Sequence, residues 1–139
     1  MRFIKLNEDW NAEPNAPEPR IEITGARLRL SFYMNPYLYP QFSENDIGVL
    51  EFTRCRQYRM GAPNDEGFYN HGQSRYQQYG VEWGEFYLVD NSDWKANFPD
   101  AKIIDGDIPV NPLNHYLFYF RDETFEVVAE KYTFHVVKA

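Results

Sequence analysis

The stretch 115–129 constrains the fold of this chain more than any other, because it carries two aromatic and β-branched runs around a short charged turn. This pattern is typical of a β-hairpin. Side chains alternate between the two faces of a strand, and few water-facing residues interrupt the first run, 115–120. We therefore expect this run to be a central strand that is covered on both faces.

The pairing expected within this hairpin follows from its turn. With a turn over 121–123, Glu126 would lie opposite Phe118. His115 would then lie several residue pairs away from Asp122, too far for a direct bond. We therefore expect no catalytic dyad within the hairpin.

Glu126 stands among apolar neighbours, so burial would require a cationic partner or a raised pKa. Arg54 and Arg56 share the parity of Leu50 and Phe52, and we expect one of them to be the partner. A structural ion pair is favoured over a functional carboxylate. Alternatively, the strand runs past the end of the core, or both arginines point toward a ligand.

Most of the remaining chain also has the period-2 alternation of strands. In the segment around 27–34, Leu28, Leu30, Phe32 and Met34 share one face, and Arg27, Arg29, Ser31 and Tyr33 share the other. Gly25 precedes this segment, and a hairpin turn there is favoured over one bent strand. Further strands are expected at 2–6, 47–58, 81–90, 102–104 and 131–137.

Helical periodicity is nearly absent from the chain. A short helix is expected over 93–98, where Asn91 or Ser92 can cap its first turn, and one helical turn over 74–79. We predict a mainly β (α+β) fold. It would consist of a single antiparallel, strongly twisted sheet or a partly open barrel, with one or two short helices.

Length and composition favour one soluble domain over residues 1–139. A chain of this length has the usual size of one domain, and its aromatic content of 18% can fill a core without disulfides. The single cysteine, Cys55, fits a reducing compartment and is expected to be a buried, inert thiol. No leader-like segment or long apolar run is present, so we expect a cytoplasmic protein without membrane contact.

The net charge of −7 is unevenly distributed along the chain. Residues 81–139 hold eleven acidic and five basic side chains, and such a surface repels phosphate backbones. Nucleic-acid binding is therefore not expected, whereas a basic protein partner would suit this half. The alternative is that the acids only solvate one side of the domain.

The polar loop 61–80 holds the densest set of reactive side chains. Asn64, Asp65, Glu66 and His71 are spaced closely enough to bind a divalent metal or to supply an acid and a base. Ordinary turn chemistry explains the same residues, and we favour it over a site. No cofactor motif is present, and neither a metal nor a cofactor is expected.

Aromatic side chains outside the predicted strands offer a further candidate surface. Trp94, together with Trp83 and the segment 37–39, can line a binding groove. In a chain so rich in aromatic residues, core filling is the simpler explanation. His135 alternates within the last strand and is expected at an edge or on the surface.

Three sequence blocks together resemble a family of short bacterial proteins that has no established function. The blocks are Gly-Ala-Pro-Asn-Asp-Glu at 61–66, Tyr-Gly-Val-Glu-Trp at 79–83 with Asn-Ser-Asp-Trp at 91–94, and 115–126. Where that family often has Cys, His and Cys, this chain has Ala62, Arg121 and Val127. The resemblance therefore implies bacterial relatives and no chemistry that depends on those three side chains.

Taken together, the sequence favours a non-catalytic protein-binding module. By analogy with other small acidic bacterial proteins, such a module can be the antidote to a toxin. The alternative is a small enzyme or ligand binder with a polar cleft, and no pattern indicates an oligomeric state. The residues predicted for binding are Arg54, Arg56, Asn64, Asp65, Glu66, His71, Trp94 and Glu126.

Overall fold

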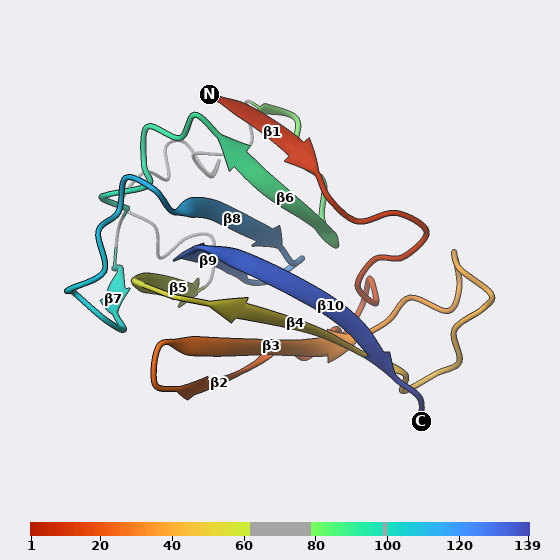
Figure 1. Cartoon of the computed structure of the whole chain (residues 1–139). Coiled ribbons are helices and arrows are strands. Elements are labelled where there is room, and N and C mark those ends of the chain that lie inside the picture. The colour runs from red at the N-terminus through yellow and green to blue at the C-terminus, as the bar shows by residue number, and fades with distance from the viewer. Residues whose placement is uncertain (62–78, 99) are drawn as a thin grey trace.

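The computed structural model describes residues 1–61, 79–98 and 100–139, and these residues form ten strands. The strands are β1 (Arg2–Lys5), β2 (Arg20–Thr24), β3 (Arg27–Tyr33), β4 (Ile47–Thr53), β5 (Gln57–Gly61), β6 (Glu85–Asp90), β7 (Lys102–Ile103), β8 (Asn114–Tyr119), β9 (Thr124–Ala129) and β10 (Lys131–Val137). They form two antiparallel sheets in the orders β1-β6-β8-β9-β5-β7 and β10-β4-β3-β2, and neither sheet closes on itself (Figure 1). The mainly β prediction is confirmed, but the prediction of a single sheet is wrong.

The main core lies between the inner faces of the two sheets. Phe32 and Phe52 of the four-stranded sheet contact Phe118 and Phe125 of the six-stranded sheet, with ring centroids 4.8 and 5.8 Å apart. Trp10, from the loop after β1, stacks on Phe134 of β10 at 4.0 Å. Large aromatic side chains that interdigitate in this way account for the high aromatic content of the chain.

One bent two-stranded ribbon connects the sheets. β4 pairs with β10 in the small sheet, and β5 pairs with β9 in the large sheet. At the bend, the three residues 54–56 lie opposite the two residues Ala129 and Glu130, and a bulge with one extra residue turns a ribbon sharply. Arg54 has a φ of 51° there, and its Nε lies 3.5 Å from Glu130.

The bulge explains why the single strand predicted over 47–58 is wrong. At the bulge Cys55 enters the core instead, so Arg54 and Arg56 do not continue the apolar face of β4. Val128 accepts a hydrogen bond from the Arg56 N–H at 2.9 Å, which starts the pairing of β5 with β9. The chain therefore changes sheets at the point where the sequence suggested a continuous strand.

Other predicted elements are found close to their expected positions. β2 and β3 form the hairpin expected around Gly25, whose φ of 59° suits the first residue of a tight two-residue turn. No α-helix is present in the described residues, and the segment 93–98, predicted as a helix, consists of turns. Most of the helical turn predicted over 74–79 lies outside the described residues. The described residues contain no helix that is long and apolar enough to span a membrane.

The C-terminus is tied to the loop between β3 and β4. The Asp46 carboxylate accepts the Ser43 and Ala139 backbone N–H groups, each at 2.9 Å, and lies 3.1 Å from the Lys138 Nζ. The Ser43 N–H and then the Ala139 N–H are the largest causes that lower the pKa of Asp46 from 3.8 to about 2. The ionised carboxylate is therefore the form that the fold stabilises.

We predict that Gly48→Ala destabilises the sandwich. An added Cβ would lie 2.6 Å from the Met34 Sδ and 2.7 Å from the Phe32 Cε2, both side chains of the core. Overpacking of this kind costs about 2 kcal/mol, which urea denaturation would measure as a lower midpoint. In the matched control Gly106→Ala, the nearest atom lies 3.6 Å away, so a similar loss in both variants would contradict the packing argument.

We predict that Asp46→Asn lowers stability only where the wild-type carboxylate is ionised. Because its folded pKa of about 2 is below the usual 3.8, the contribution is complete above pH 3.8 and disappears as the pH falls toward 2. Urea midpoints of both proteins between pH 6 and pH 2 should therefore converge in acid. Glu44→Gln, which neutralises an exposed neighbour, controls for the change in net charge, and a pH-independent effect of Asp46→Asn would contradict the prediction.

Candidate functional site

The outer face of the six-stranded sheet, turned away from the four-stranded sheet, carries a group of buried polar side chains. They alternate along β5, β8 and β9 with residues that pack into the main core. The group consists of Gln57, Arg59, His115, Thr124 and Glu126, each at most 3% exposed. Buried polar groups require partners, and buried ionisable groups are often found at functional sites, so this cluster is a candidate site.

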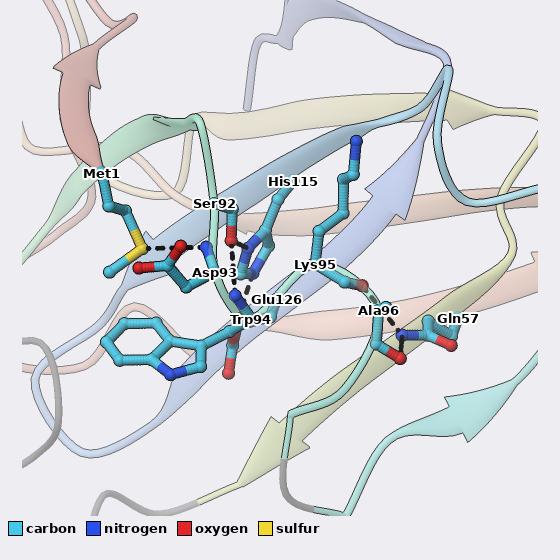
Figure 2. Close-up of polar contacts among 9 residues, drawn as sticks. All are labelled: Met1, Gln57, Ser92, Asp93, Trp94, Lys95, Ala96, His115 and Glu126. Carbon is cyan, nitrogen blue, oxygen red and sulfur yellow. Dashed lines mark hydrogen bonds and ion pairs between the residues drawn. The ribbon is translucent and has the colours of Figure 1, made fainter.

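A chain of hydrogen bonds runs through the centre of this cluster, from Ser92 to His115 to Glu126 (Figure 2). The Ser92 Oγ lies 2.7 Å from the His115 Nδ1, and the His115 Nε2 lies 2.9 Å from the Glu126 Oε1. The histidine and glutamate side chains are both fully buried. The pair thus belongs to the interior, and Ser92 is its half-buried outer end.

The register of β8 and β9 brings His115 and Glu126 together. Glu126 lies opposite Leu117 instead of Phe118, because the loop after Tyr119 holds four residues instead of the predicted three. A shift of one residue moves a side chain to the other face of the sheet. Glu126 therefore shares the outer face with His115, and the expected pairing with Arg54 or Arg56 is wrong.

The described contacts of the cluster anchor the loop 91–98, which has little regular structure of its own. The Ser92 Oγ accepts the Trp94 N–H at 3.1 Å, and the Gln57 side chain donates to the Lys95 carbonyl at 3.1 Å (Figure 2). The His115 ring also stacks on Phe98, with centroids 5.5 Å apart. Gln57 of the sheet and Ser92 of the loop itself thus satisfy backbone polar groups of a loop that forms no helix.

The hydrogen bonds from Ser92 through His115 to Glu126 can run in the direction that activates a serine hydroxyl. Because Ser92 already accepts the Trp94 N–H, its own proton can be donated to the His115 Nδ1, and the Nε2 proton to Glu126. Acyl transfer also needs N–H donors for the developing oxyanion. The Asp93 N–H donates to the Met1 sulfur at 3.4 Å, and the Trp94 N–H donates to Ser92 itself. Neither of these two described N–H groups is therefore free to stabilise an oxyanion beside Ser92.

The predicted site residues do not form one cleft in the described part of the chain. Arg54 pairs with Glu130 at the bend, and the Arg56 Nη1 donates to two loop carbonyls at 2.7 Å. Trp94 is half-buried and lies edge-on to Tyr79, with centroids 6.0 Å apart. The remaining four predicted residues, Asn64, Asp65, Glu66 and His71, lie outside the described residues.

Cys55 and His135, two further side chains considered from the sequence, lie outside this cluster. Cys55 is fully buried at the bend, and this burial raises the pKa of its thiol to about 12, so the expectation of an inert thiol is confirmed. His135 is exposed on the edge strand β10, as expected. Within the described residues, no three His, Cys, Asp or Glu side chains are placed to hold a metal ion.

The outer face of the four-stranded sheet is different, because no other described strand or core cluster covers it. Its side chains form three cross-strand rows that run from β10 through β4 and β3 to β2. Two rows are paired across all four strands, Thr133–Glu51–Arg29–Glu22 and His135–Val49–Ser31–Arg20. In the third, Lys131 pairs with Thr53 and Arg27 pairs with Thr24, one position beyond the last β3–β4 pair, Leu28–Phe52. Most of these side chains are exposed or half-buried, so this face is open to solvent.

The first two rows line a shallow hollow of about 500 Å³. Within it, the Arg29 guanidinium lies 2.7 Å from Glu51 and 4.0 Å from Glu22. The hydrogen bond from Arg29 lowers the pKa of Glu51, so the ionised form of this carboxylate is favoured. Arg27 and Lys131 complete the lining and add two positive charges.

The sequence contains local signals for the polar face of the four-stranded sheet and for the buried His115–Glu126 pair, but not the strand pairing that assembles either one. The alternation of Arg27, Arg29 and Ser31 already indicated a polar face on the second hairpin. The pairing of Arg29 with Glu51 depends on how β3 and β4 meet, which no local pattern states. The His115–Glu126 pair was missed because the turn length was misjudged by one residue.

No protein-family model matches this chain, and neither a curated protein nor a solved structure is similar enough to match it. The resemblance to short bacterial proteins therefore stays a prediction. Function has to be inferred from the geometry of the chain itself.

We predict that His115→Phe destabilises the fold far more than Ser92→Ala. Phenylalanine would leave the buried Glu126 carboxylate without its histidine, and breaking a buried pair costs about 3 kcal/mol. Removal of the Ser92 hydroxyl spares that pair and should cost about 1 kcal/mol. Both values can be measured by urea denaturation, and equal losses would contradict the central role of the pair.

Proposed function

We propose that this chain is a non-catalytic protein-binding module that docks its partner on the outer face of the four-stranded sheet. One observation carries this proposal: the face is open across all four strands, whereas loops bury the outer face of the other sheet. An uncovered sheet face with a hollow of about 500 Å³ is a natural surface for association.

The composition of this face supports binding to a protein. Arginine and tyrosine are enriched in protein interfaces, and the face presents Arg20, Arg27, Arg29 and, beyond the last complete row, Tyr33. Val137 and Ile47 pair beside Tyr33 and make this end of the face more apolar. A surface that is cationic at one end and apolar at the other favours an oriented macromolecular partner.

The charge of the face favours an acidic partner. Four basic side chains, Arg20, Arg27, Arg29 and Lys131, stand against the two acids Glu22 and Glu51, although the whole chain carries −7. A local positive patch of this kind steers a negatively charged surface into register.

The basic partner expected from the acidic C-terminal half has less support. Glu85 and Glu126 are buried, and Asp90 and Glu130 pair with Arg2 and Arg54. The other acids of this half are distributed over the loops at 82, 93–107 and 122–123. They therefore give a basic protein no single continuous face.

The proposal is tested with the double variant Ser31→Glu/His135→Glu, which adds two acidic groups to one row of the face. The matched control is Lys102→Glu on the edge of the other sheet, which changes the net charge by about the same amount. Partners cross-linked to the tagged full chain in its native host would be identified by mass spectrometry. Each partner would then be purified and its affinity measured by calorimetry.

We expect the double variant to bind the purified partner at least about tenfold more weakly, because two like charges now face an acidic surface. The control should bind like the wild type, and circular dichroism should show both variants folded. An unchanged affinity of the double variant, or an equal loss in the control, would show that the partner docks elsewhere.

A further inference from the structure

The row Lys131–Thr53–Arg27 differs from its neighbour in how its charges are balanced. In the neighbouring row, Arg29 lies between Glu51 and Glu22 and is neutralised. Arg27 and Lys131 are both exposed, and no described carboxylate forms a close ion pair with either, although the charge of Arg27 contributes to the lowered pKa of Glu51. Two cations of the hollow are therefore available to an outside group.

Thr53 lies between these two cations. It pairs with Lys131 in the register of β10 with β4, and on its other side Leu28, the residue after Arg27, pairs with Phe52. Adjacent strands lie about 4.8 Å apart, so the backbones that carry Lys131 and Arg27 are about 10 Å apart. Both side chains are long enough to meet above Thr53.

The Thr53 hydroxyl is a second, independent sign of a missing group. Its Oγ1 is buried and has no hydrogen-bond partner among the described residues. Buried polar atoms in folded proteins nearly always have a partner. A donor without a partner at the floor of a cationic hollow suits an anionic oxygen that arrives from outside.

We propose that Lys131, Thr53 and Arg27 bind one carboxylate, from an aspartate or glutamate side chain of the docked partner. This inference rests on the proposed docking face and adds the group that the face recognises. Arg27 can hold both carboxylate oxygens, Lys131 can neutralise the charge from the other side, and Thr53 can donate its hydroxyl.

The charge of the hollow favours a carboxylate over a phosphate. Its charged lining comprises Arg27, Arg29 and Lys131 against Glu22 and Glu51, which leaves one net positive charge. A carboxylate carries one negative charge and matches this excess. A dianionic phosphate would exceed it and would approach the two nearby carboxylates.

The test uses the full chain labelled with ¹⁵N and two blocked six-residue peptides, one alternating Glu and Thr and the other alternating Gln and Thr. We expect saturable shifts of the Arg27, Thr53 and Lys131 amide signals with the Glu peptide and at least about tenfold weaker binding of the Gln peptide. Equal binding of both peptides, or shifts confined to other residues, would overturn the proposal. Inorganic phosphate that displaces the Glu peptide at lower concentration than acetate would overturn the assignment to a carboxylate.

Three variants and one control assign the contacts. Arg27→Gln and Lys131→Gln should each weaken binding of the Glu peptide about tenfold. Thr53→Val should weaken it severalfold without lowering the urea midpoint, because the hydroxyl has no hydrogen-bond partner among the described residues. Lys102→Gln, on the edge of the other sheet, should bind like the wild type.

The outcomes separate this inference from the docking proposal. If Ser31→Glu/His135→Glu releases the natural partner while Arg27→Gln and Lys131→Gln retain it, the docking face stands and the carboxylate site is overturned. If Lys102→Gln weakens binding of the Glu peptide as much as Arg27→Gln does, binding is diffuse and the specific row is overturned. If Thr53→Val binds like the wild type, the role of the threonine is overturned.

Discussion

The outer layer of the six-stranded sheet depends on the buried pair of His115 and Glu126. A carboxylate in an apolar interior is costly unless a charged or hydrogen-bonding group meets it, and here the imidazole of the adjacent strand does so at 2.9 Å. The same imidazole holds Ser92 through its other nitrogen and stacks on Phe98. This one polar pair therefore links the central strands β8 and β9 on their outer face, and it also holds the loop 91–98 that covers them.

The two sheets differ in whether their outer faces are covered. The six-stranded sheet uses its inner face for the main core and its outer face for two smaller clusters, one with Tyr87 and Leu117 and one with Phe98 and Val128. The four-stranded sheet uses only its inner face for packing, so its outer face is left to charged and hydroxyl side chains. Rigidity on one side and an accessible face on the other are what a preorganised binding surface requires.

Most strands were predictable from the sequence, whereas their assembly was not. Alternation located β3 and β10, and Gly25 marked a tight turn, because these are local properties of the chain. The division into two sheets depends on a bulge opposite Ala129 and Glu130, which the alternation of side chains from 47 to 58 conceals. The buried pair depends on the length of one turn, and an error of a single residue there assigned Glu126 to the wrong face.

The bent ribbon also sets the order in which the fold can be completed. β4 finds its partner β10 only after about eighty further residues, and β5 waits almost as long for β9. During synthesis, the hairpin of β2 and β3 can form early, but β4 keeps one unpaired edge until the last strands emerge. Such long-range pairing slows folding and exposes strand edges to other chains. Loss of even the final strand would therefore remove the support of β4 and one cation of its open face.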